Sequence, residues 1–370
     1  MTSPIEKRLG LELLRFYLAF AVVLYHYLFI GPIHKIIHPP YGNAPDSDLF
    51  WIGMLLGALA VPAFFVISGY TIFFSAERNN WRNFSAARVS RLYPALIVCA
   101  TCTFLLQPVP QGQLASEYTR MYLDAVLFVP IYFERGMIDA SYWSLAYEVR
   151  FYLFVAILLA LRLFKHVSLV IIVVSLLGTA MSLAPEGVDL SKYFLFPYAS
   201  FFGIGISIAQ IERQGATIPN VLIAALHLGT ASYGFLYGYE FIDMLDGVRS
   251  PWWVGLGAAL FCTGVVIVHL RAKPSAKMAR LAIPLGAISY PLYLFHQEIG
   301  YELIKYLAPH LGFWASTILA IFVALIAAWL VNIAVEKPFS RPLRKLLSAN
   351  RKRDHEQSTT DLATEAVRPR

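Results

Sequence analysis

Long apolar stretches, separated by short polar connections, run through most of this 370-residue chain. Ten of them reach about 17 to 25 residues, the length that an α-helix needs to cross the hydrocarbon core of a bilayer. They cover approximately residues 10–30, 50–74, 91–107, 142–163, 167–184, 194–210, 218–238, 252–270, 281–303 and 312–334. The pattern predicts an all-α fold, a polytopic integral membrane bundle of about ten transmembrane helices.

The composition supports this class. Hydrophobic residues make up 58% of the chain and charged residues only 14%, and the mean hydropathy is +0.59. These values exclude an ordinary soluble globular domain. The first apolar stretch is too long for a removed signal peptide and has no small-residue cleavage site close behind it, so we expect a retained helix. The chain turns polar at about Leu346. We therefore expect a membrane domain over residues 1–345 and a disordered polar cytoplasmic tail over residues 346–370.

The basic residues are distributed unevenly between the two sides of this predicted topology. Twenty Lys and Arg residues fall on one side and six on the other. The richer side is expected to face the cytoplasm, which requires an even number of spans and places both termini in the cytoplasm. The net charge of +7 then reflects cytoplasmic loops that face anionic lipid. We expect no nucleic-acid partner.

Two ionisable residues, Arg15 and His26, lie within the first apolar stretch. Their eleven-residue step corresponds to about three helical turns, so both side chains lie on one helix face, about 16 Å apart. An ionisable side chain at membrane depth is energetically costly and by default marks a functional site that faces the protein interior. The alternative is that Arg15 extends to the cytoplasmic interface and that His26 is an unrelated core histidine.

Two further motifs lie at the expected cytoplasmic ends of the second and third stretches. Ser68 and Gly69 would allow another group to approach the backbone closely, although packing of small residues between helices is the alternative. Arg88 and Arg91 are three residues apart and share a helix face. Such a pair can bind phosphate groups in a forked geometry. The alternative is that both arginines only anchor the helix on the cytoplasmic side.

The fourth and ninth stretches also contain ionisable residues. Glu148 is expected near the outer half of the bilayer, at a depth similar to that of His26. Arg150, two residues away, points to a different helix face, so we expect Glu148 to find its partner on another helix. A second intramembrane histidine, His296, follows Pro291, where we expect the helix to bend.

The sequence gives no indication of a metal site. Its three cysteines, Cys99, Cys102 and Cys262, all fall in apolar segments, and we predict no disulfide framework. Cys99 and Cys102 are one turn apart and could form a metal pair, but buried small side chains are the expected interpretation. The histidines and carboxylates do not fall at metal-ligand spacing on any predicted helix, so we expect no metal.

These segments together resemble the acyltransferase-3 family, bacterial membrane acyltransferases that modify extracytoplasmic glycans. Six motifs match in order: Arg-x10-His from Arg15, Phe-Phe-x-x-Ser-Gly ending at Gly69, Arg-x-x-Arg-x-x-Pro from Arg88, Trp-Ser-Leu-x-x-Glu-x-x-Phe-Tyr from Trp143, Ser-Tyr-x-x-Tyr-Leu-x-His ending at His296, and Glu-Lys-Pro from Glu336. The resemblance extends from Arg15 to Pro338. It covers nearly the whole predicted membrane domain.

The resemblance implies a membrane O-acyltransferase. Such an enzyme moves an acyl group, usually acetyl, from cytoplasmic acyl-coenzyme A to a sugar hydroxyl of a cell-surface polysaccharide, lipopolysaccharide or glycolipid. It implies acetyl-coenzyme A as the donor and a multi-pass location in the bacterial inner (cytoplasmic) membrane. Some members carry a periplasmic SGNH hydrolase-like domain after the bundle, and we expect a stand-alone form without it.

Under this resemblance, three residues are expected to form the catalytic group. His26 would act as the general base on the sugar hydroxyl, a contribution on the order of 10² to 10⁴ in rate. Glu148 would orient its imidazole or stabilise the charged form, and Arg15 would complete the group. The alternative chemistry has His26 accept the acyl group as a transient acyl-imidazole before the sugar attacks.

The same resemblance implies donor-binding residues. Arg88 and Arg91 are expected to hold the phosphates of coenzyme A. Ser68 and Gly69, at the same cytoplasmic mouth, would let the thioester chain pass close to the backbone.

Other residues are expected to contact the sugar. Trp143, Tyr147 and Ser144 are the candidates near the outer mouth, although interfacial anchoring is the alternative for the two aromatic residues. His296 would be an auxiliary polar residue.

Two other classes of function are compatible with the hydrophobic pattern and the charge alone. A multi-helix transporter or flippase of a glycan or lipid-linked substrate would also place Arg, Glu and His inside the bilayer, but it predicts no dependence on acyl-coenzyme A. A structural membrane subunit is disfavoured by the number of ionisable residues at membrane depth. The six motifs favour the enzyme.

Overall fold

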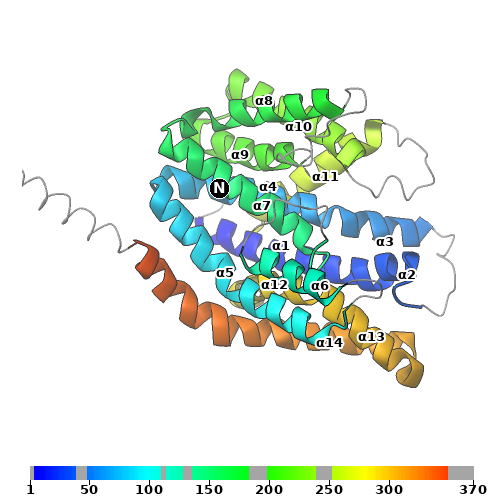
Figure 1. The fold of residues 1–370 in the computed structure, drawn as a ribbon. Helices are drawn as coiled ribbons and strands as arrows, with labels where there is room; N and C mark the ends of the chain where they lie inside the picture. Colours follow the sequence, from blue (N-terminus) through cyan, green and yellow to red (C-terminus); the bar gives the residue numbers. More distant parts are fainter. Residues whose placement is uncertain are drawn as a thin grey trace, which may run out of the picture.

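The computed structural model describes residues 4–38, 48–109, 114–127, 136–182, 198–238 and 252–348, and every regular element within these ranges is a helix. In chain order the elements are α1 (Pro4–Tyr25), the π-helix η1 (His26–Ile30), α2 (Gly31–Ile33), α3 (Asp48–Ala58), α4 (Ala60–Glu77), α5 (Trp81–Leu106), α6 (Ala115–Val126), α7 (Tyr142–Ala160), the 3-10 helix η3 (Phe164–His166), α8 (Val167–Ser182), α9 (Ala199–Gln214), α10 (Ile218–Gly238), α11 (Trp252–Arg271), α12 (Ala276–Phe295), α13 (Gln297–Leu311), α14 (Phe313–Val331) and the π-helix η5 (Asn332–Glu336). Figure 1 shows their arrangement. Helix continues to residue 348, and residues 349–370 of the predicted tail lie outside the described ranges.

The apolar pattern predicted the helices correctly. Each of the ten predicted segments is helical over most of its described residues. Within the described ranges seven helical stretches are long and apolar enough to cross a membrane: Ile5–Ile33, Leu55–Glu77, Trp81–Leu106, Tyr142–Ala160, Trp252–Arg271, Ala276–Phe295 and Phe313–Ser348. The other three predicted segments form α8, α9 and α10. The protein is a polytopic membrane helical bundle.

Two predicted spans are interrupted in the structure. The second divides at Leu59 into α3 and α4. The ninth ends as α12 at Phe295, and α13 begins at Gln297. Pro291 lies inside α12, which continues past it. His296 therefore occupies the junction of two helices instead of the interior of one.

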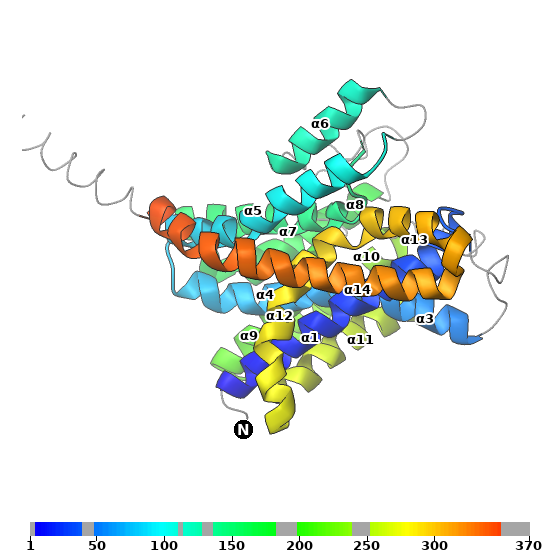
Figure 2. The same ribbon diagram turned by 90° about the horizontal axis from the view of Figure 1, so that it is seen from below.

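Helix α4 lies at the centre of the bundle. Of the residues in its apolar window 78% are buried, whereas 28% are buried in the span that begins with α14. Because lipid can cover an apolar helix as well as protein can, this position reflects the helices that pack against α4 and not its hydropathy alone. α9 packs along α4, and α8, α10 and α11 extend that side of the bundle. α1 packs against α12, and α13 and α14 lie beyond (Figures 1 and 2).

The start of α1 and the end of the last helix lie at the same end of the bundle (Figures 1 and 2). We call it the terminal end, and the opposite end the distal end. Lys7 near the start of α1 pairs with Glu212 near the end of α9 at 2.7 Å. The common location agrees with the prediction that both termini lie on one side of the membrane, and the charge pattern predicts that this side is cytoplasmic.

Candidate active site

His26 is the first residue of the π-helix η1, which continues α1 toward the distal end. A π turn is wider than an α turn, and such turns within α-helices are frequent at functional sites. Nδ1 of His26 lies 2.9 Å from Nε2 of His296 at the α12–α13 junction. The fold therefore brings together two histidines that are 270 residues apart in the chain.

The hydrogen-bond partners of the pair define its tautomers. Nδ1 of His296 lies 2.7 Å from the carbonyl oxygen of Tyr293. Because a carbonyl oxygen can only accept, this nitrogen carries a proton, and in neutral His296 the acceptor is Nε2. Nδ1 of His26 must then donate to His296. The His26 ring is also hydrogen-bonded to the backbone of Val22, one turn earlier on α1. With the proton on Nδ1, Nε2 of neutral His26 is unprotonated, which is the form that a general base requires.

Two buried tyrosines hold the backbone of this pair. The Tyr27 hydroxyl donates to the carbonyl oxygen of His296 at 2.6 Å. The Tyr301 hydroxyl donates to the carbonyl oxygen of His26 at 3.3 Å. Each tyrosine thus links the element that carries one histidine to the backbone of the other, which restricts the relative movement of the two rings.

A buried carboxylate, Asp139, lies in the segment that leads into α7. Its Oδ1 accepts from the backbone N–H of Ser141 at 2.9 Å and from the Ser141 hydroxyl at 2.5 Å. Its Oδ2 accepts from the backbone N–H of Glu298 at 3.4 Å. Burial raises the pKa of Asp139 to about 6. Burial, together with the charge of Asp139, raises the pKa of Glu298 to about 7.

Ser144 joins the histidine pair through Tyr293. The Tyr293 hydroxyl donates to the carbonyl oxygen of Ser141 at 2.8 Å, so the Ser144 hydroxyl, 2.6 Å away, is the donor to Tyr293. The same Tyr293 supplies the carbonyl that accepts from His296. The predicted sugar-binding Ser144 is therefore held by Tyr293, which connects the start of α7 to the end of α12.

Glu148 belongs to a second polar cluster. Its Oε1 accepts from the Ser68 hydroxyl of α4 at 3.0 Å and from the Tyr152 hydroxyl of α7. Glu148 thus finds one partner on another helix, as predicted, and a second, Tyr152, one turn away on its own helix. Ser68 also accepts, through its backbone carbonyl, from the Thr71 hydroxyl at 3.3 Å.

The prediction that Glu148 lies at the depth of His26 and orients its imidazole is wrong for this structure. Ser144 is level with Tyr293, to which it is hydrogen-bonded. Tyr293 lies three residues from His296 toward the terminal end, and Glu148 lies four residues beyond Ser144 in the same direction. At 1.5 Å per residue these steps separate Glu148 from the histidine pair by about 10 Å along the bundle. The sequence could not show this, because the register between α7 and α12 depends on tertiary packing.

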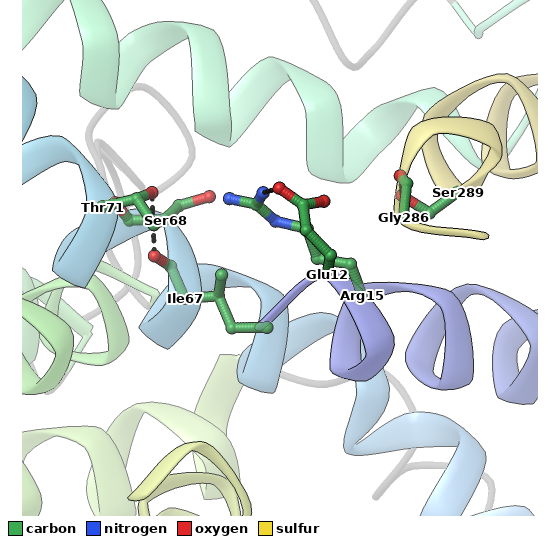
Figure 3. A network of polar contacts seen from close by, with 7 residues as sticks. All are labelled: Glu12, Arg15, Ile67, Ser68, Thr71, Gly286 and Ser289. Atoms are coloured by element: carbon green, nitrogen blue, oxygen red, sulfur yellow. Dashed lines mark hydrogen bonds and ion pairs between the residues drawn. The ribbon is translucent and has the colours of Figure 1, made fainter. Parts of the chain in front are cut away.

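Three arginines and three carboxylates form this second cluster, which we call the charged cluster. Its members are Glu12, Arg15, Arg88, Arg91, Glu148 and Glu336, all linked electrostatically to other members. Nη1 of Arg15 lies 3.2 Å from Oε1 of Glu12, one turn earlier on α1. In Figure 3 the Arg15 guanidinium, bonded to Glu12, points toward Ser68 on α4. With all six groups ionised the formal charges balance, which lowers the energetic cost of placing them inside the bundle.

Arg88 and Arg91 differ in how freely they can bind a ligand. The Arg88 guanidinium donates to the Ser75 hydroxyl at 3.2 Å and lies 5.7 Å from the ring centroids of Phe84 and Tyr152. Arg91 keeps exposed surface, although the charges of Glu12, Glu148 and Glu336 act on it. The protein therefore holds Arg88 through Ser75 and the two rings but leaves its buried Nε without a hydrogen-bond partner, whereas Arg91 keeps exposed surface.

Gly69 takes the alternative role that the sequence left open, packing between helices. A Cβ atom built on Gly69 would lie 2.0 Å from the carbonyl oxygen of Phe202 on α9. A Cβ on Gly205 of α9 would lie 2.0 Å from the carbonyl oxygen of Val66. The two glycines let the backbones of α4 and α9 approach closely. Gly69 faces α9, and its assignment as a donor-binding residue is corrected accordingly.

The remaining predicted residues form an aromatic group at the start of α7. The ring centroids of Trp143 and Tyr147 lie 5.3 Å and 4.8 Å from that of Tyr198, which precedes α9. The Arg150 guanidinium lies 5.3 Å from the centroid of the Tyr147 ring. Tyr147 and Tyr198 are buried, and Trp143 is partly exposed. Of the three aromatic rings in this group, Trp143 is the one that is not buried.

The sequence prediction missed several site residues. Tyr152 and Glu336 belong to the family motifs, but the motifs alone gave them no role. Glu12 was also missed, although it precedes Arg15 by only one turn. Tyr293 also lay within a quoted motif. Asp139 stood outside every motif, and its only sequence signal was an acidic residue beside an apolar stretch. Their importance emerges from contacts between helices that are far apart in the chain.

Within the described ranges no group of three or more His, Cys, Asp and Glu side chains could hold a metal ion. Cys99, Cys102 and Cys262 are free thiols, and the first and last of them are buried.

Comparisons with known proteins agree with the motifs. The chain matches the acyltransferase-3 family, described as an acyltransferase domain, over residues 8–333. It is 25% identical over 322 residues to an O-acetyl transferase of the Shigella phage Sf6, a match that covers 82% of this chain and 90% of the phage protein. No solved structure matches. The matched region includes the histidine pair and every member of the charged cluster except Glu336, and the chain belongs to the acyltransferase-3 family as a membrane O-acyltransferase.

Proposed function

We propose that this protein is an O-acetyltransferase that moves an acetyl group from acetyl-coenzyme A to a sugar hydroxyl of a cell-surface polysaccharide, lipopolysaccharide or glycolipid. The proposed location is the bacterial inner membrane, with the terminal end in the cytoplasm. Family membership and the name of the phage relative support O-acyl transfer. Membership of an acyltransferase family disfavours the transporter alternative.

The observation that carries the proposal is the unprotonated Nε2 of His26. Its other nitrogen is engaged by His296, whose own Nδ1 is engaged by the Tyr293 carbonyl. A sugar hydroxyl is a weak nucleophile near neutral pH, so removal of its proton as it attacks is the step that most needs a base. The histidine pair supplies a base with a defined tautomer and a fixed ring orientation.

The proposed reaction is direct acyl transfer. The sugar oxygen attacks the thioester carbonyl carbon while Nε2 of His26 takes the hydroxyl proton. The new C–O bond forms, the C–S bond breaks, and the proton on Nε2 passes to the departing thiolate. The products are the sugar ester and coenzyme A. His296 stays neutral and keeps accepting from Nδ1 of His26 throughout.

An acyl-imidazole route uses the same nitrogen. Nε2 of His26 attacks the thioester carbonyl, the C–S bond breaks, and the thiolate leaves and is protonated by water. The sugar oxygen then attacks the acyl-imidazole, the C–N bond breaks, and the hydroxyl proton passes to the released Nε2 and from there to water. This route predicts ping-pong kinetics and labelled protein in the absence of a sugar acceptor.

The charged cluster is the proposed site for the donor. Coenzyme A carries a pyrophosphate and a 3′-phosphate, which arginine binds well. Arg91 has accessible surface, so we propose it as the principal phosphate contact. Arg88 is hydrogen-bonded to Ser75 and Arg15 is paired with Glu12, so we propose that these two arginines contribute positive charge near the phosphates without contacting them directly. Ser68 lies at the same level and lines the proposed path of the thioester chain.

The acceptor sugar is proposed to bind at the distal end, near Trp143. Aromatic rings commonly bind the apolar faces of sugars, and Trp143 keeps accessible surface beside Tyr147. Ser144, one residue after Trp143, is hydrogen-bonded to Tyr293, whose carbonyl accepts from His296, and this connection supports an acceptor site beside the histidine pair. The proposed route of the acyl group therefore runs from Arg91 toward His26.

The test uses the purified protein in nanodiscs with acetyl-labelled coenzyme A and a panel of purified lipopolysaccharides and exopolysaccharides. We expect label to reach one of these glycans with the wild type and with His310→Ala, which alters an exposed histidine of α13. We expect no transfer with His26→Ala. If neither glycan nor protein is labelled and the wild type does not bind acetyl-coenzyme A, the proposal is refuted.

A further inference from the structure

Glu148, the carboxylate that the sequence assigned to His26, lies too far away to support the histidine pair. Another group must therefore hold the two rings in place. A base of this kind usually needs a third group that fixes its orientation. In this structure the position of His26 depends on His296, and His296 occupies the link between α12 and α13. Whatever fixes this link between α12 and α13 therefore also positions His26.

Helix α13 begins at Gln297 without a cap from its own N-cap residue, because His296 provides no side-chain cap hydrogen bond. The first backbone N–H groups of a helix have no partner within the helix. Asp139 provides one from outside, since its Oδ2 accepts from the N–H of Glu298, the second residue of α13. In return the Glu298 carboxylate is hydrogen-bonded to the backbone N–H of Ala140. The two reciprocal hydrogen bonds resemble a capping box, but Asp139 and Ala140 come from a distant segment and Glu298 is the second residue of α13.

The same short segment also holds the end of α12. The Tyr293 hydroxyl donates to the carbonyl oxygen of Ser141 at 2.8 Å, and the Tyr142 hydroxyl donates to that of Leu294 at 3.2 Å. The segment that carries Asp139 therefore contacts the chain immediately before and immediately after His296. Asp139 itself has no exposed surface, and a buried carboxylate with three donors is a rigid anchor.

We propose that Asp139 is the positioning residue of the histidine pair: it caps α13, fixes His296, and through His296 orients the imidazole of His26. This inference rests on the proposed function for its effect on the rate, but its structural part can be tested without any substrate. Asp139 acts through backbone and helix position and does not touch the proposed reacting atoms.

The main test compares Asp139→Asn with Glu302→Gln. Asn keeps an acceptor for Ser141 but replaces Oδ2 with an NH₂ group, which cannot accept from the Glu298 N–H. Glu302 is a matched carboxylate one turn further along α13 whose ion pair with Lys305 is partly exposed. We expect Asp139→Asn to lower kcat by about 10- to 100-fold, the scale of a displacement near 1 Å, with an unchanged KM for acetyl-coenzyme A. Glu302→Gln should leave both constants unchanged.

A nuclear magnetic resonance measurement supplies the readout that does not need activity. In protein labelled with ¹⁵N-histidine, the hydrogen bond between Nδ1 of His26 and Nε2 of His296 gives a coupling between the two nitrogens. We expect this coupling in the wild type and in Glu302→Gln, and its loss in Asp139→Asn. If Asp139→Asn keeps the coupling, the proposal is overturned, whatever its rate. If the wild type shows the coupling but transfers no acyl group, the proposed function fails and the positioning role is still tested.

A second pair of variants covers the case in which Asp139→Asn does not fold. Glu298→Pro removes the N–H that Asp139 binds, and proline is tolerated in the first turn of a helix. Glu298→Ala removes the same carboxylate but keeps the N–H. We expect the coupling between His26 and His296 to be lost in the proline variant and retained in the alanine variant. Retention of the coupling in the proline variant would contradict the cap.

Discussion

Substitution of Gly69 by alanine tests whether the structure assigns this motif residue correctly. The Cβ atom of alanine would lie 2.0 Å from the carbonyl oxygen of Phe202 and 2.8 Å from its carbonyl carbon. Real Cβ atoms essentially never come closer than 3.0 Å. The obstacle is backbone within a helix, which cannot rotate away as a flexible side chain would.

The size of the effect follows from this geometry. α4 and α9 must separate by about 1 Å, and they form the most extensive helix contact in the described part of the chain. Overpacking of a well-packed interior usually costs about 1–3 kcal/mol and occasionally more. We expect Gly69→Ala at the upper part of this range, because Gly205 makes the reciprocal contact with Val66 and the whole helix pair has to shift.

The assay is thermal unfolding of the purified protein in detergent, with Gly229→Ala as the control. A Cβ on Gly229 of α10 meets nothing within 4 Å, so this control should keep or slightly raise the unfolding temperature, because alanine favours helix more than glycine. Gly69→Ala should lower it clearly. If Gly69→Ala unfolds like the wild type and instead raises the KM for acetyl-coenzyme A, Gly69 contacts the donor and the packing assignment is refuted.

Three further predictions concern the donor, the distal carboxylates and the acceptor. Arg91→Ala should raise the KM for acetyl-coenzyme A by about 10-fold or more, the scale of a lost charge-assisted hydrogen bond. The control, Arg82→Ala, alters an exposed arginine of the same helix and should leave this KM unchanged. Equal KM values in both variants would contradict the phosphate contact. The pKa of Glu298 is raised from 4.5 to about 7 in the folded protein, so the folded state binds more protons than the unfolded state between these values and becomes less stable as the pH rises through them. Glu298→Gln removes this loss, so its unfolding temperature should exceed that of the wild type at about pH 8 and approach it near pH 4; a difference independent of pH would argue against the raised pKa. Trp143→Ala should raise the KM for the glycan and leave that for acetyl-coenzyme A unchanged, and equal effects on both would place Trp143 outside the acceptor site.

The apolar pattern predicted the membrane helices because a helix in lipid must be apolar over its whole length, and this requirement is local. Interruptions were harder to predict. The break at His296 follows an apolar run without a glycine, and Pro291, the obvious helix breaker, lies inside α12. The junction is stabilised by Asp139, which is distant in the chain, so nothing local in the sequence marks it.

The sequence predicted several residues of the site but not the contacts among them. The motifs contained His26, His296 and Glu148, but the pairing among them depends on the register of α7 against α12. A shift of two turns along a helix moves a side chain by about 10 Å, which decides whether Glu148 reaches a histidine or Ser68. Arg15 was expected with His26 on one helix face, and the structure gives each a separate set of partners, Glu12 for the arginine and His296 for the histidine.

The central claim is that His26 carries the chemistry through an unprotonated Nε2 whose tautomer is set by His296. It is tested most directly by single-turnover transfer of labelled acetyl from acetyl-coenzyme A to the glycan that the wild type accepts. The account predicts that His26→Ala loses at least about 10²-fold in the rate of this step while still binding acetyl-coenzyme A. It predicts a smaller loss for His296→Ala, which keeps the base but not its orientation. Transfer at the wild-type rate by His26→Ala would contradict the account.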